Sequence, residues 1–239
     1  MPLFIYSDNP AAVSVNVSRL DSMKITDTKI YIISGLGVDQ RVFSKINFGS
    51  LDIEYLDWIT PNPHEPLAIY AKRLSSKITV KQPILIGLSF GGMIAIEIAK
   101  VIPVKKIILL ASAKGNHEFP LRYRLASWLR INQLVPNSFL KWHNFLSDYF
   151  FGVSSKEDSL LLKQILNDTD PVFMAWAIHQ IPQWKNTSVP DNLIHVHGSR
   201  DHIIPIKNVK SNFVIKGAGH FMTVTHAKEV EKLLREMLF

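Results

Sequence analysis

The chain has 239 residues, of which 47% are hydrophobic and 20% charged, an ordinary globular balance that excludes disordered and fibrous proteins. Its formal net charge is +7, and a basic balance of this size permits an acidic partner without indicating one. Because the chain has no cysteine, disulfides, a thiolate nucleophile and cysteine-ligated zinc are all excluded.

The amino-terminal residues predict a small β element and no export signal. Residues 3–17 are typical of a hairpin around the turn Ser7-Asp8-Asn9-Pro10. The first eight residues contain neither a basic start nor a long apolar stretch, so they do not indicate a signal peptide. No apolar run approaches the roughly 20 residues that span a bilayer. We therefore expect a cytoplasmic protein.

Short apolar runs then alternate with helical patterns. The predicted strands are residues 29–34, 53–56, 83–87, 106–110, 193–196 and 213–215. Most runs are continuously apolar, as expected for parallel strands that are covered on both faces. The predicted helices are residues 66–76, 90–101 and 226–238, and Glu97 and Lys100 give the second a polar edge. This alternation predicts an α/β fold, with a mostly parallel central sheet flanked by helices.

Residues 115–189 interrupt the alternation. They contain no strand-like run, and their prolines divide them into several predicted helices, one of which starts at Asp170-Pro171. We interpret this block as a helical insertion between two strands. Residues 1–114 and 190–239 would then form the core of the protein.

The most specific motif is Gly87-Leu88-Ser89-Phe90-Gly91-Gly92, which follows an apolar strand and begins a helix. A serine hydroxyl is a poor nucleophile unless it is held beside a base, and a tight strand-to-helix turn holds it above the sheet. Such a turn requires small residues two positions before and after the serine, here Gly87 and Gly91. The helix N-terminus also offers backbone N–H groups to an oxyanion. The motif predicts Ser89 as a nucleophile; the alternative is a glycine-rich helix start with a capping serine.

Two further loops carry polar side chains where predicted strands end. Gly198-Ser199-Arg200-Asp201 follows one strand, and Gly217-Ala218-Gly219-His220 follows the last. Catalytic groups gather at the carboxyl ends of strands in open α/β sheets. The order Ser89, Asp201, His220 therefore predicts a nucleophile, an acid and a base, although each loop alone could be an ordinary solvated turn.

The elbow, the Gly-x-x-Asp loop and the Gly-x-Gly-His segment resemble those of the α/β-hydrolase superfamily. The resemblance covers residues 29–114 and 190–239, and the predicted hairpin fits the opening strands of that family. It implies that residues 115–189 are the lid that many members insert after their sixth strand. Some members carry the acid after that strand, but here no acid precedes Glu118, so Asp201 is favoured.

The resemblance also implies an oxyanion loop at Ser34-Gly35-Leu36-Gly37. There the backbone N–H of Leu36 would act together with that of Phe90. Many relatives have His-Gly at the start of this loop, where this chain has Ser34-Gly35. Because the donors are backbone groups, the difference concerns the support of the loop rather than the chemistry.

The implied reaction is hydrolysis of a small, largely apolar carboxylic ester or thioester, without a cofactor. Ser89 would attack the carbonyl carbon, His220 would take its proton, and Asp201 would stabilise the imidazolium. A lyase or carbon–carbon hydrolase with the same triad is an alternative, because fold alone does not decide between these chemistries. It would need a further acid, base or ammonium group, for which Lys114 and His117 are candidates. A non-catalytic ligand-binding protein is the other alternative.

Other kinds of site are less well supported. His195 and His197 alternate on one strand like two metal ligands, but no third ligand lies nearby in the sequence, so no metal is expected. Gly35-Leu36-Gly37 lacks the third glycine and the downstream acid of a dinucleotide site. Serine at position 89 argues against relatives that open epoxides or displace halides, because those reactions need aspartate there.

The predicted lid carries both basic and apolar side chains. Arg122, Arg124 and Arg130 accompany apolar residues at helical spacing, which favours an amphipathic helix packed over the cleft. A role at a membrane surface is the alternative. The basic residues form no long run and there is no nucleic-acid motif, so the expected partner is a small-molecule substrate rather than nucleic acid. The sequence leaves the oligomeric state open.

Overall fold

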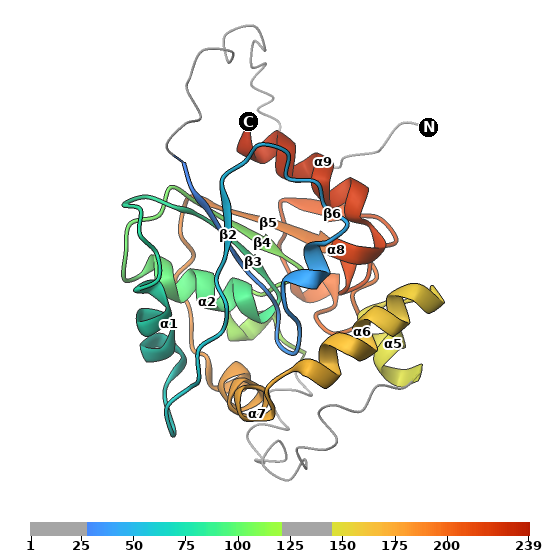
Figure 1. Ribbon diagram of the computed structural model, residues 1–239, viewed down its shortest axis with the longest axis horizontal. Coiled ribbons are helices and arrows are strands. Elements are labelled where there is room, and N and C mark those ends of the chain that lie inside the picture. Colours follow the sequence, from blue (N-terminus) through green and yellow to red (C-terminus); the bar gives the residue numbers. More distant parts are fainter. Residues whose placement is uncertain (1–27, 121–144) are drawn as a thin grey trace, which may run out of the picture.

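A computed structural model describes residues 28–120 and 145–239 of the chain, without the side chains of residues 145 and 146. A central sheet runs through the molecule, with helices on both of its faces (Figure 1). The predicted hairpin at residues 3–17 and the arginine-rich part of the predicted lid at residues 121–144 lie outside the described residues.

The predicted strands form one parallel six-stranded sheet with the order β2-β1-β3-β4-β5-β6. Their bounds are β1 (Ile30–Ile33), β2 (Ile53–Tyr55), β3 (Ile84–Leu88), β4 (Lys106–Leu110), β5 (Leu193–Gly198) and β6 (Phe213–Ile215). The strand order reverses between β1 and β3, so the loops that follow these two strands diverge there. Open α/β sheets bind ligands at such a point.

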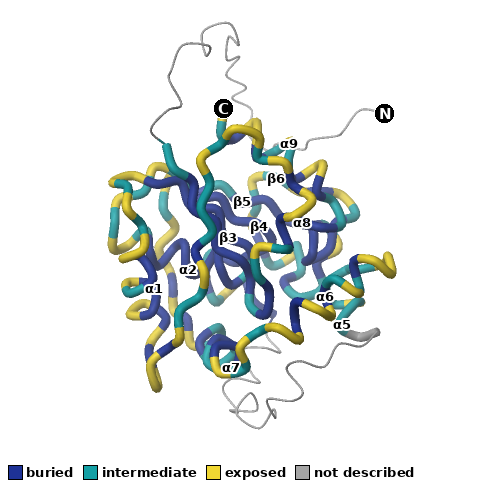
Figure 2. The backbone as a smooth tube through the Cα atoms, viewed as in Figure 1, coloured by how far each residue is buried: buried dark blue, intermediate teal, exposed yellow. Residues whose placement is uncertain are grey.

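Each face of the sheet has its own apolar core, because the strands are apolar on both sides. Ile30 and Ile32 of β1 face α8 (Met222–Thr225) and α9 (Ala227–Leu238). Tyr31 and Ile33 face α1 (Leu67–Ser75) and α2 (Phe90–Ala99). Figure 2 shows the strands as the buried centre of the molecule. This arrangement confirms the predicted α/β class, with helices on both sides of a parallel sheet.

The polar edge predicted for α2 is wrong for Glu97, which is enclosed, whereas Lys100 is exposed as expected. Glu97 is 5% exposed; it accepts a hydrogen bond from Trp184 Nε1 at 2.7 Å and pairs with Lys100 Nζ at 2.5 Å. Trp184 follows a short 3₁₀ turn at Ile181–Gln183, far along the chain. Glu97 therefore marks a buried contact rather than a solvent-facing edge.

Helices fill the described part of the chain between β4 and β5. They are α5 (Phe145–Phe151), α6 (Lys156–Asp168) and α7 (Pro171–Gln180). Elsewhere in the described residues, and between these helices and the strands, there are short 3₁₀ helices: η2 (Gln40–Phe43), η3 (Asn116–Glu118), η5 (Ile181–Gln183) and η6 (Ile206–Asn208). α7 begins as predicted: Pro171 is its first residue, and Asp170 accepts the N–H of Val172 at 2.9 Å.

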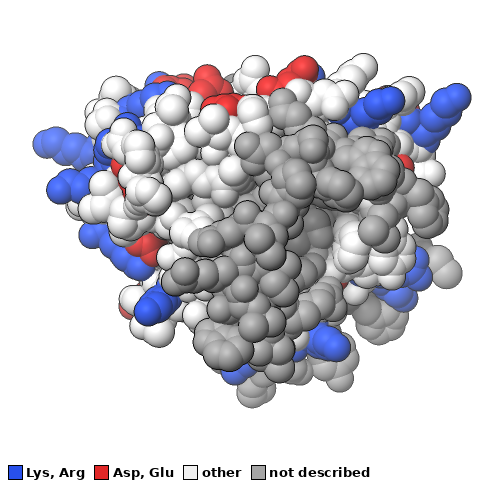
Figure 3. Space-filling view, turned by 90° about the horizontal axis from the view of Figure 1, so that it is seen from below, with Lys and Arg blue, Asp and Glu red and all other residues white. Residues whose placement is uncertain are grey.

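α5, α6 and α7 lie together at one end of the molecule, the lower end in Figure 1. Figure 3 views the molecule from that end, where lysine and arginine side chains stand at several places along the margin of the described surface. Within residues 28–120 and 145–239, no helix is long and apolar enough to cross a membrane.

Candidate active site

Ser89 sits in a strained turn between β3 and α2. Its backbone angles, φ 50° and ψ −117°, lie in a region that L-residues rarely adopt, at a cost of roughly 1–3 kcal/mol. Two hydrogen bonds to the neighbouring strand hold the turn: Ser89 N–H donates to Leu110 O at 2.9 Å, and Ser112 Oγ donates to Ser89 O at 2.6 Å. The predicted strand–turn–helix context of the serine is therefore confirmed.

The glycines of the elbow allow backbone segments to approach closely. A Cβ atom on Gly87 would lie 2.5 Å from Gly92 Cα, and one on Gly91 would collide with the backbone at the end of β1. Position 92 also requires glycine, because a Cβ atom there would lie 2.7 Å from Ser112 Cβ. Gly87 and Gly91 thus have the steric role that the motif predicts, and Gly92 shares it.

The structure brings the three predicted side chains into one hydrogen-bonded chain. His220 Nε2 lies 2.8 Å from Ser89 Oγ, and His220 Nδ1 lies 2.7 Å from Asp201 Oδ2. Asp201 and His220 are 3% and 5% exposed. The other carboxylate oxygen, Oδ1, accepts the N–H groups of Ile203 and Ile204 at 2.9 and 2.8 Å. These bonds fix the direction in which the carboxylate presents Oδ2.

The surroundings of Asp201 favour its ionised form. Burial alone would raise the pKa of this carboxyl, but the charge and hydrogen bond of His220 oppose that effect. His197 and the backbone of Ile204 add to this opposition, and the net result is a pKa below the usual value of an aspartate. An anionic Asp201 can accept Nδ1–H of His220, which leaves Nε2 free to accept a proton from Ser89.

Glu118, the alternative candidate for the acid that pairs with His220, bonds to other groups. Glu118 is buried, but it accepts the N–H of Lys114 at 2.6 Å, and its Oε1 lies 3.9 Å from Lys114 Nζ. Lys114 Nζ also donates to the carbonyl of Lys210. His117, the other group that an alternative chemistry would require, is exposed and folded back over Gly115. Of the two acids, the structure places Asp201 on His220.

The predicted oxyanion loop lies beside the nucleophile. A Cβ atom built on Gly35 would be 3.3 Å from Ser89 Cβ, so the loop backbone is in close contact with the elbow. Ser34 is buried, and its Oγ donates to Val38 O at 3.0 Å, which closes the loop around Leu36. The serine that replaces the histidine of many relatives therefore supports the loop by a bond within the loop itself.

α5 contacts the loop that carries His220. Phe221 N–H donates to Phe151 O at 2.9 Å, and the Phe151 ring meets the His220 ring edge-on, with 5.9 Å between the centroids. Gly152, at φ +73°, approaches Gly219 so closely that a Cβ atom on Gly152 would lie 2.8 Å from Gly219 Cα. A segment between β4 and β5 therefore restrains a loop after β6.

α6 and α7 contact other parts of the site. Thr169 Oγ1, between the two helices, donates to Gly37 O in the oxyanion loop at 2.9 Å. Phe90, the residue after the nucleophile, packs edge-on against Phe173 and Trp176 of α7, with centroids 6.2 and 6.0 Å apart. The helices between β4 and β5 therefore contact both the predicted oxyanion loop and the elbow.

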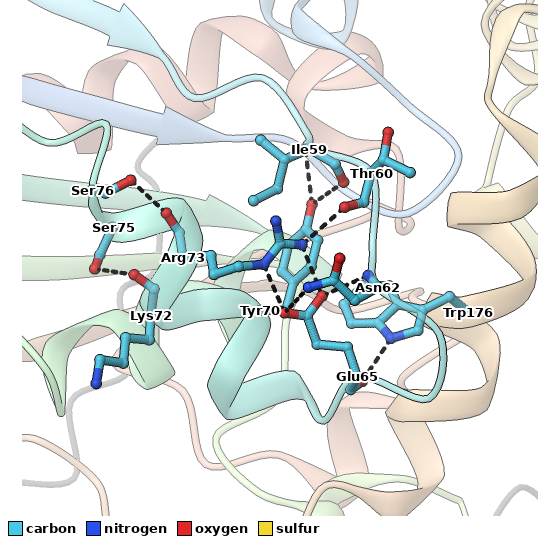
Figure 4. Close-up of polar contacts among 10 residues, drawn as sticks. All are labelled: Ile59, Thr60, Asn62, Glu65, Tyr70, Lys72, Arg73, Ser75, Ser76 and Trp176. Atoms are coloured by element: carbon cyan, nitrogen blue, oxygen red, sulfur yellow. Dashed lines mark hydrogen bonds and ion pairs between the residues drawn. The ribbon is translucent and has the colours of Figure 1, made fainter.

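α7 also rests on the loop that precedes α1 (Figure 4). Trp176 Nε1–H donates to the carbonyl of Glu65 at 2.8 Å, and the Glu65 carboxylate bonds to Arg73 Nε at 2.7 Å. This bond with Arg73 keeps the pKa of Glu65 below its usual value. Tyr70 OH joins the same loop by bonding both the N–H and the C=O of Ile59. These contacts fix α7 relative to the core.

His195 and His197 do face each other on β5, with Nε2 of His195 3.3 Å from Nδ1 of His197. Among the described residues, no group of three or more His, Cys, Asp or Glu side chains is placed to hold a metal ion. His197 instead lies beside Asp201, with 3.4 Å between Nε2 and Oδ2. Because His197 lies near the end of a strand and four residues before Asp201, the sequence indicates that the two side chains could meet.

Comparisons with known proteins agree with this architecture. The sequence profile described as "Alpha/beta hydrolase family" matches residues 47–233. Comparison with curated protein sequences gives no match.

Solved structures of several hydrolases are similar over most of the chain. A lipase-esterase related protein from Clostridium acetobutylicum has a TM-score of 0.65 at 17% identity, covering 88% of this chain and 94% of that one. A thermophilic esterase from Thermogutta terrifontis has a TM-score of 0.64 at 16% identity, covering 88% and 89%. A meta-cleavage product hydrolase from Pseudomonas fluorescens has a TM-score of 0.62 at 14% identity, covering 88% and 90%. At these identities the likeness establishes the fold, and together with the profile match it shows that the chain belongs to the alpha/beta hydrolase family.

Proposed function

We propose that this protein is a serine hydrolase that cleaves a small, largely apolar carboxylic ester or thioester through an acyl-enzyme on Ser89. The observation that carries the proposal is the continuous chain from Ser89 Oγ to His220 at 2.8 Å and from His220 to Asp201 at 2.7 Å. Nucleophile and base are within hydrogen-bond reach, and a third group orients the base.

In the proposed reaction Ser89 Oγ forms a bond to the carbonyl carbon while its proton passes to His220 Nε2. The tetrahedral intermediate then expels the alcohol or thiol, which takes that proton from His220. Water attacks the acyl-enzyme with His220 again as the base, and the carboxylic acid leaves as Ser89 regains its proton. Asp201 stabilises the imidazolium in both halves of the reaction.

The backbone N–H groups of Phe90 and Leu36 are the proposed donors to the oxyanion. As the first residue of α2, Phe90 has an N–H that finds no acceptor within the helix. Leu36 directly follows Gly35, the residue of this loop that lies against the elbow. Donors of this kind stabilise the charge that develops in the transition state rather than the substrate.

We also propose that residues 115–189 act as a lid that selects the substrate. The contacts of α5, α6 and α7 with the His220 loop, the oxyanion loop and Phe90 support this role. The aromatic side chains of the segment should leave little room for a charged acyl group. An apolar pocket would also select acyl length, because it discriminates by roughly 1–3 kcal/mol per methylene. A structural neighbour is described as a thermophilic esterase, and this agrees with ester cleavage.

A carbon–carbon hydrolase or lyase would need an additional proton donor, acceptor or cation beside Ser89. This alternative is considered because one structural neighbour is described as a meta-cleavage product hydrolase. However, Lys114 Nζ is engaged by Glu118 and Lys210, and His117 is exposed. The contacts of these two candidates support ester hydrolysis over the alternative.

The test is a panel of activated esters and thioesters with acyl chains of increasing length, assayed with wild type and Ser89→Ala. Hydrolysis that Ser89→Ala abolishes is expected, whereas a folded wild type that cleaves none of them would leave a ligand-binding role instead. A matched pair of neutral and carboxylate-bearing esters then tests the lid. Higher kcat/KM is expected for the neutral ester, and preference for the anion would contradict the apolar pocket.

A further inference from the structure

Asp201 faces a second buried imidazole that the proposed mechanism does not use. His197 is the penultimate residue of β5 and is 0% exposed, and its Nε2 lies 3.4 Å from Asp201 Oδ2, the oxygen that also meets His220. The same Nε2 lies 2.8 Å from the carbonyl oxygen of Ile204. Both neighbours are hydrogen-bond acceptors when Asp201 is ionised.

The contacts define the proton positions on the two strand histidines. Because His197 Nε2 faces the carbonyl of Ile204 and a carboxylate, it must carry a hydrogen. In neutral His197, Nδ1 is then bare and accepts a hydrogen from Nε2 of His195, 3.3 Å away. His195 Nδ1, which has no hydrogen-bond partner among the described residues, then carries the lone pair, and the backbone of Ser112 is a further polar group beside this imidazole. This arrangement of protons accounts for the contacts of His197 with Ile204, Asp201 and His195.

The pair stays neutral under this arrangement. Burial lowers the pKa of His195 well below its usual value, and the charges of His197 and Lys114 lower it further. Burial also lowers the pKa of His197, although Asp201 and the carbonyl of Ile204 offset part of this effect. His197 therefore acts as a fixed neutral donor rather than as a second cation competing with His220.

The bond to Ile204 connects His197 to the orientation of the carboxylate. Ile204 uses both of its backbone groups, since its N–H donates to Asp201 Oδ1 at 2.8 Å and its C=O accepts from His197. Loss of the His197 donor would leave a buried carbonyl unpaired and release the backbone that grips Oδ1. The carboxylate could then turn away from His220.

We propose that His197 is a positioning residue for the catalytic acid: its Nε2–H, held on the Ile204 carbonyl, fixes Asp201 so that Oδ2 points at His220. This inference rests on the proposed hydrolase function, because Asp201 has a catalytic role only there. His195 contributes by donating to Nδ1 of His197, which selects the tautomer that can hold Ile204.

A matched pair of variants separates the donor from the packing. His197→Met fills the space of the imidazole without a donor, whereas the amide nitrogen of His197→Gln can reach the position of Nε2. We expect His197→Met to lower kcat by about 10- to 100-fold with little change in KM, the size of effect known for groups that orient metal-ligating side chains from behind. His197→Gln should recover most of the loss. Equal kcat in both variants, whether wild-type or reduced, would overturn the proposal.

Two NMR measurements on histidine-labelled protein need no substrate and therefore test this inference separately from the hydrolase function. In wild type, His197 should be the Nε2–H tautomer at neutral pH, and finding Nδ1–H would overturn the proposal even if a variant failed to fold. The downfield Nδ1 proton of His220, which reports the bond to Asp201, should persist in His197→Gln and be lost or shifted in His197→Met. Its persistence in both variants would also overturn the proposal.

Discussion

Asp201→Asn tests the acid by exchanging one oxygen for an NH₂ group of nearly the same shape. Oδ1 of Asp201 accepts two backbone N–H groups, from Ile203 and Ile204, at 2.9 and 2.8 Å. An asparagine can satisfy them only with its oxygen, so its NH₂ must take the place of Oδ2, which lies 2.7 Å from His220 Nδ1. The other neighbour of that position, His197 Nε2–H at 3.4 Å, is a donor and would favour the oxygen there, but this single longer contact is outweighed by the two short backbone bonds at Oδ1.

Two N–H groups cannot bond each other, so His220 should give up the Nδ1 hydrogen and carry one on Nε2 instead. That nitrogen faces Ser89 Oγ at 2.8 Å and would then be unable to take the serine proton. The same exchange in a serine protease lowers kcat by about 10⁴-fold. At about 1.36 kcal/mol per factor of ten, the barrier should rise by about 5 kcal/mol.

The assay compares kcat and KM of wild type, Asp201→Asn and Glu118→Gln on one activated ester, with circular dichroism as the check of folding. Glu118→Gln is the matched control, because Glu118 is also a buried acid near the site but bonds the N–H of Lys114. It should cost far less turnover. Should Asp201→Asn keep more than about a tenth of kcat, or should Glu118→Gln be the more damaging variant, the tautomer argument fails.

Three further predictions follow from particular contacts. Ser89 should be the hydroxyl that a fluorophosphonate modifies rapidly, and Ser89→Ala should abolish labelling while remaining folded; an adduct mapped elsewhere would remove the nucleophile assignment. Gly152→Ala should lower the free energy of unfolding more than Gly49→Ala does in urea titrations. Both glycines have positive φ, which costs alanine about 1–2 kcal/mol, but only the Cβ at position 152 would collide with Gly219. Equal losses in the two variants would refute the close-contact argument. The pKa of His195 is lowered in the folded protein, so below about pH 6.5 the unfolded chain binds the extra proton and the free energy of unfolding decreases as the pH is lowered. His195→Gln keeps a donor to His197 and should flatten this slope by up to about 1.4 kcal/mol per pH unit, whereas an unchanged slope would mean that His195 is already charged in the folded state.

The strands, their parallel arrangement and the elbow follow from local sequence, because each depends on neighbouring residues. Continuous apolar runs such as residues 83–87 predict strands that are buried on both faces, and the sheet bears this out. The spacing of Gly87 and Gly91 around Ser89 reflects a turn whose atoms all lie within a few residues. Such short-range constraints leave a direct trace in the sequence.

Contacts between distant segments are decided by the tertiary structure. Glu97 reads as a solvent-facing residue, yet Trp184 covers it, and no pattern around residue 97 predicts a tryptophan from beyond α7. Likewise, the ring of Phe151 in α5 packs against that of His220 in the loop after β6, and no local pattern predicts this contact. Partners of this kind depend on how the helices and loops pack against the sheet.

The choice of acid shows both contributions. The order Ser89, Asp201, His220 and the ends of the strands place these residues on one edge of the sheet, because parallel strands present their carboxyl ends together. Only the folded loop shows that two backbone N–H groups hold Oδ1 and turn Oδ2 toward His220. The sequence by itself thus determined which side chains share an edge, while the orientation of each hydrogen bond came from the folded loops, both within the turn from Asp201 to Ile204 and where that turn meets His220.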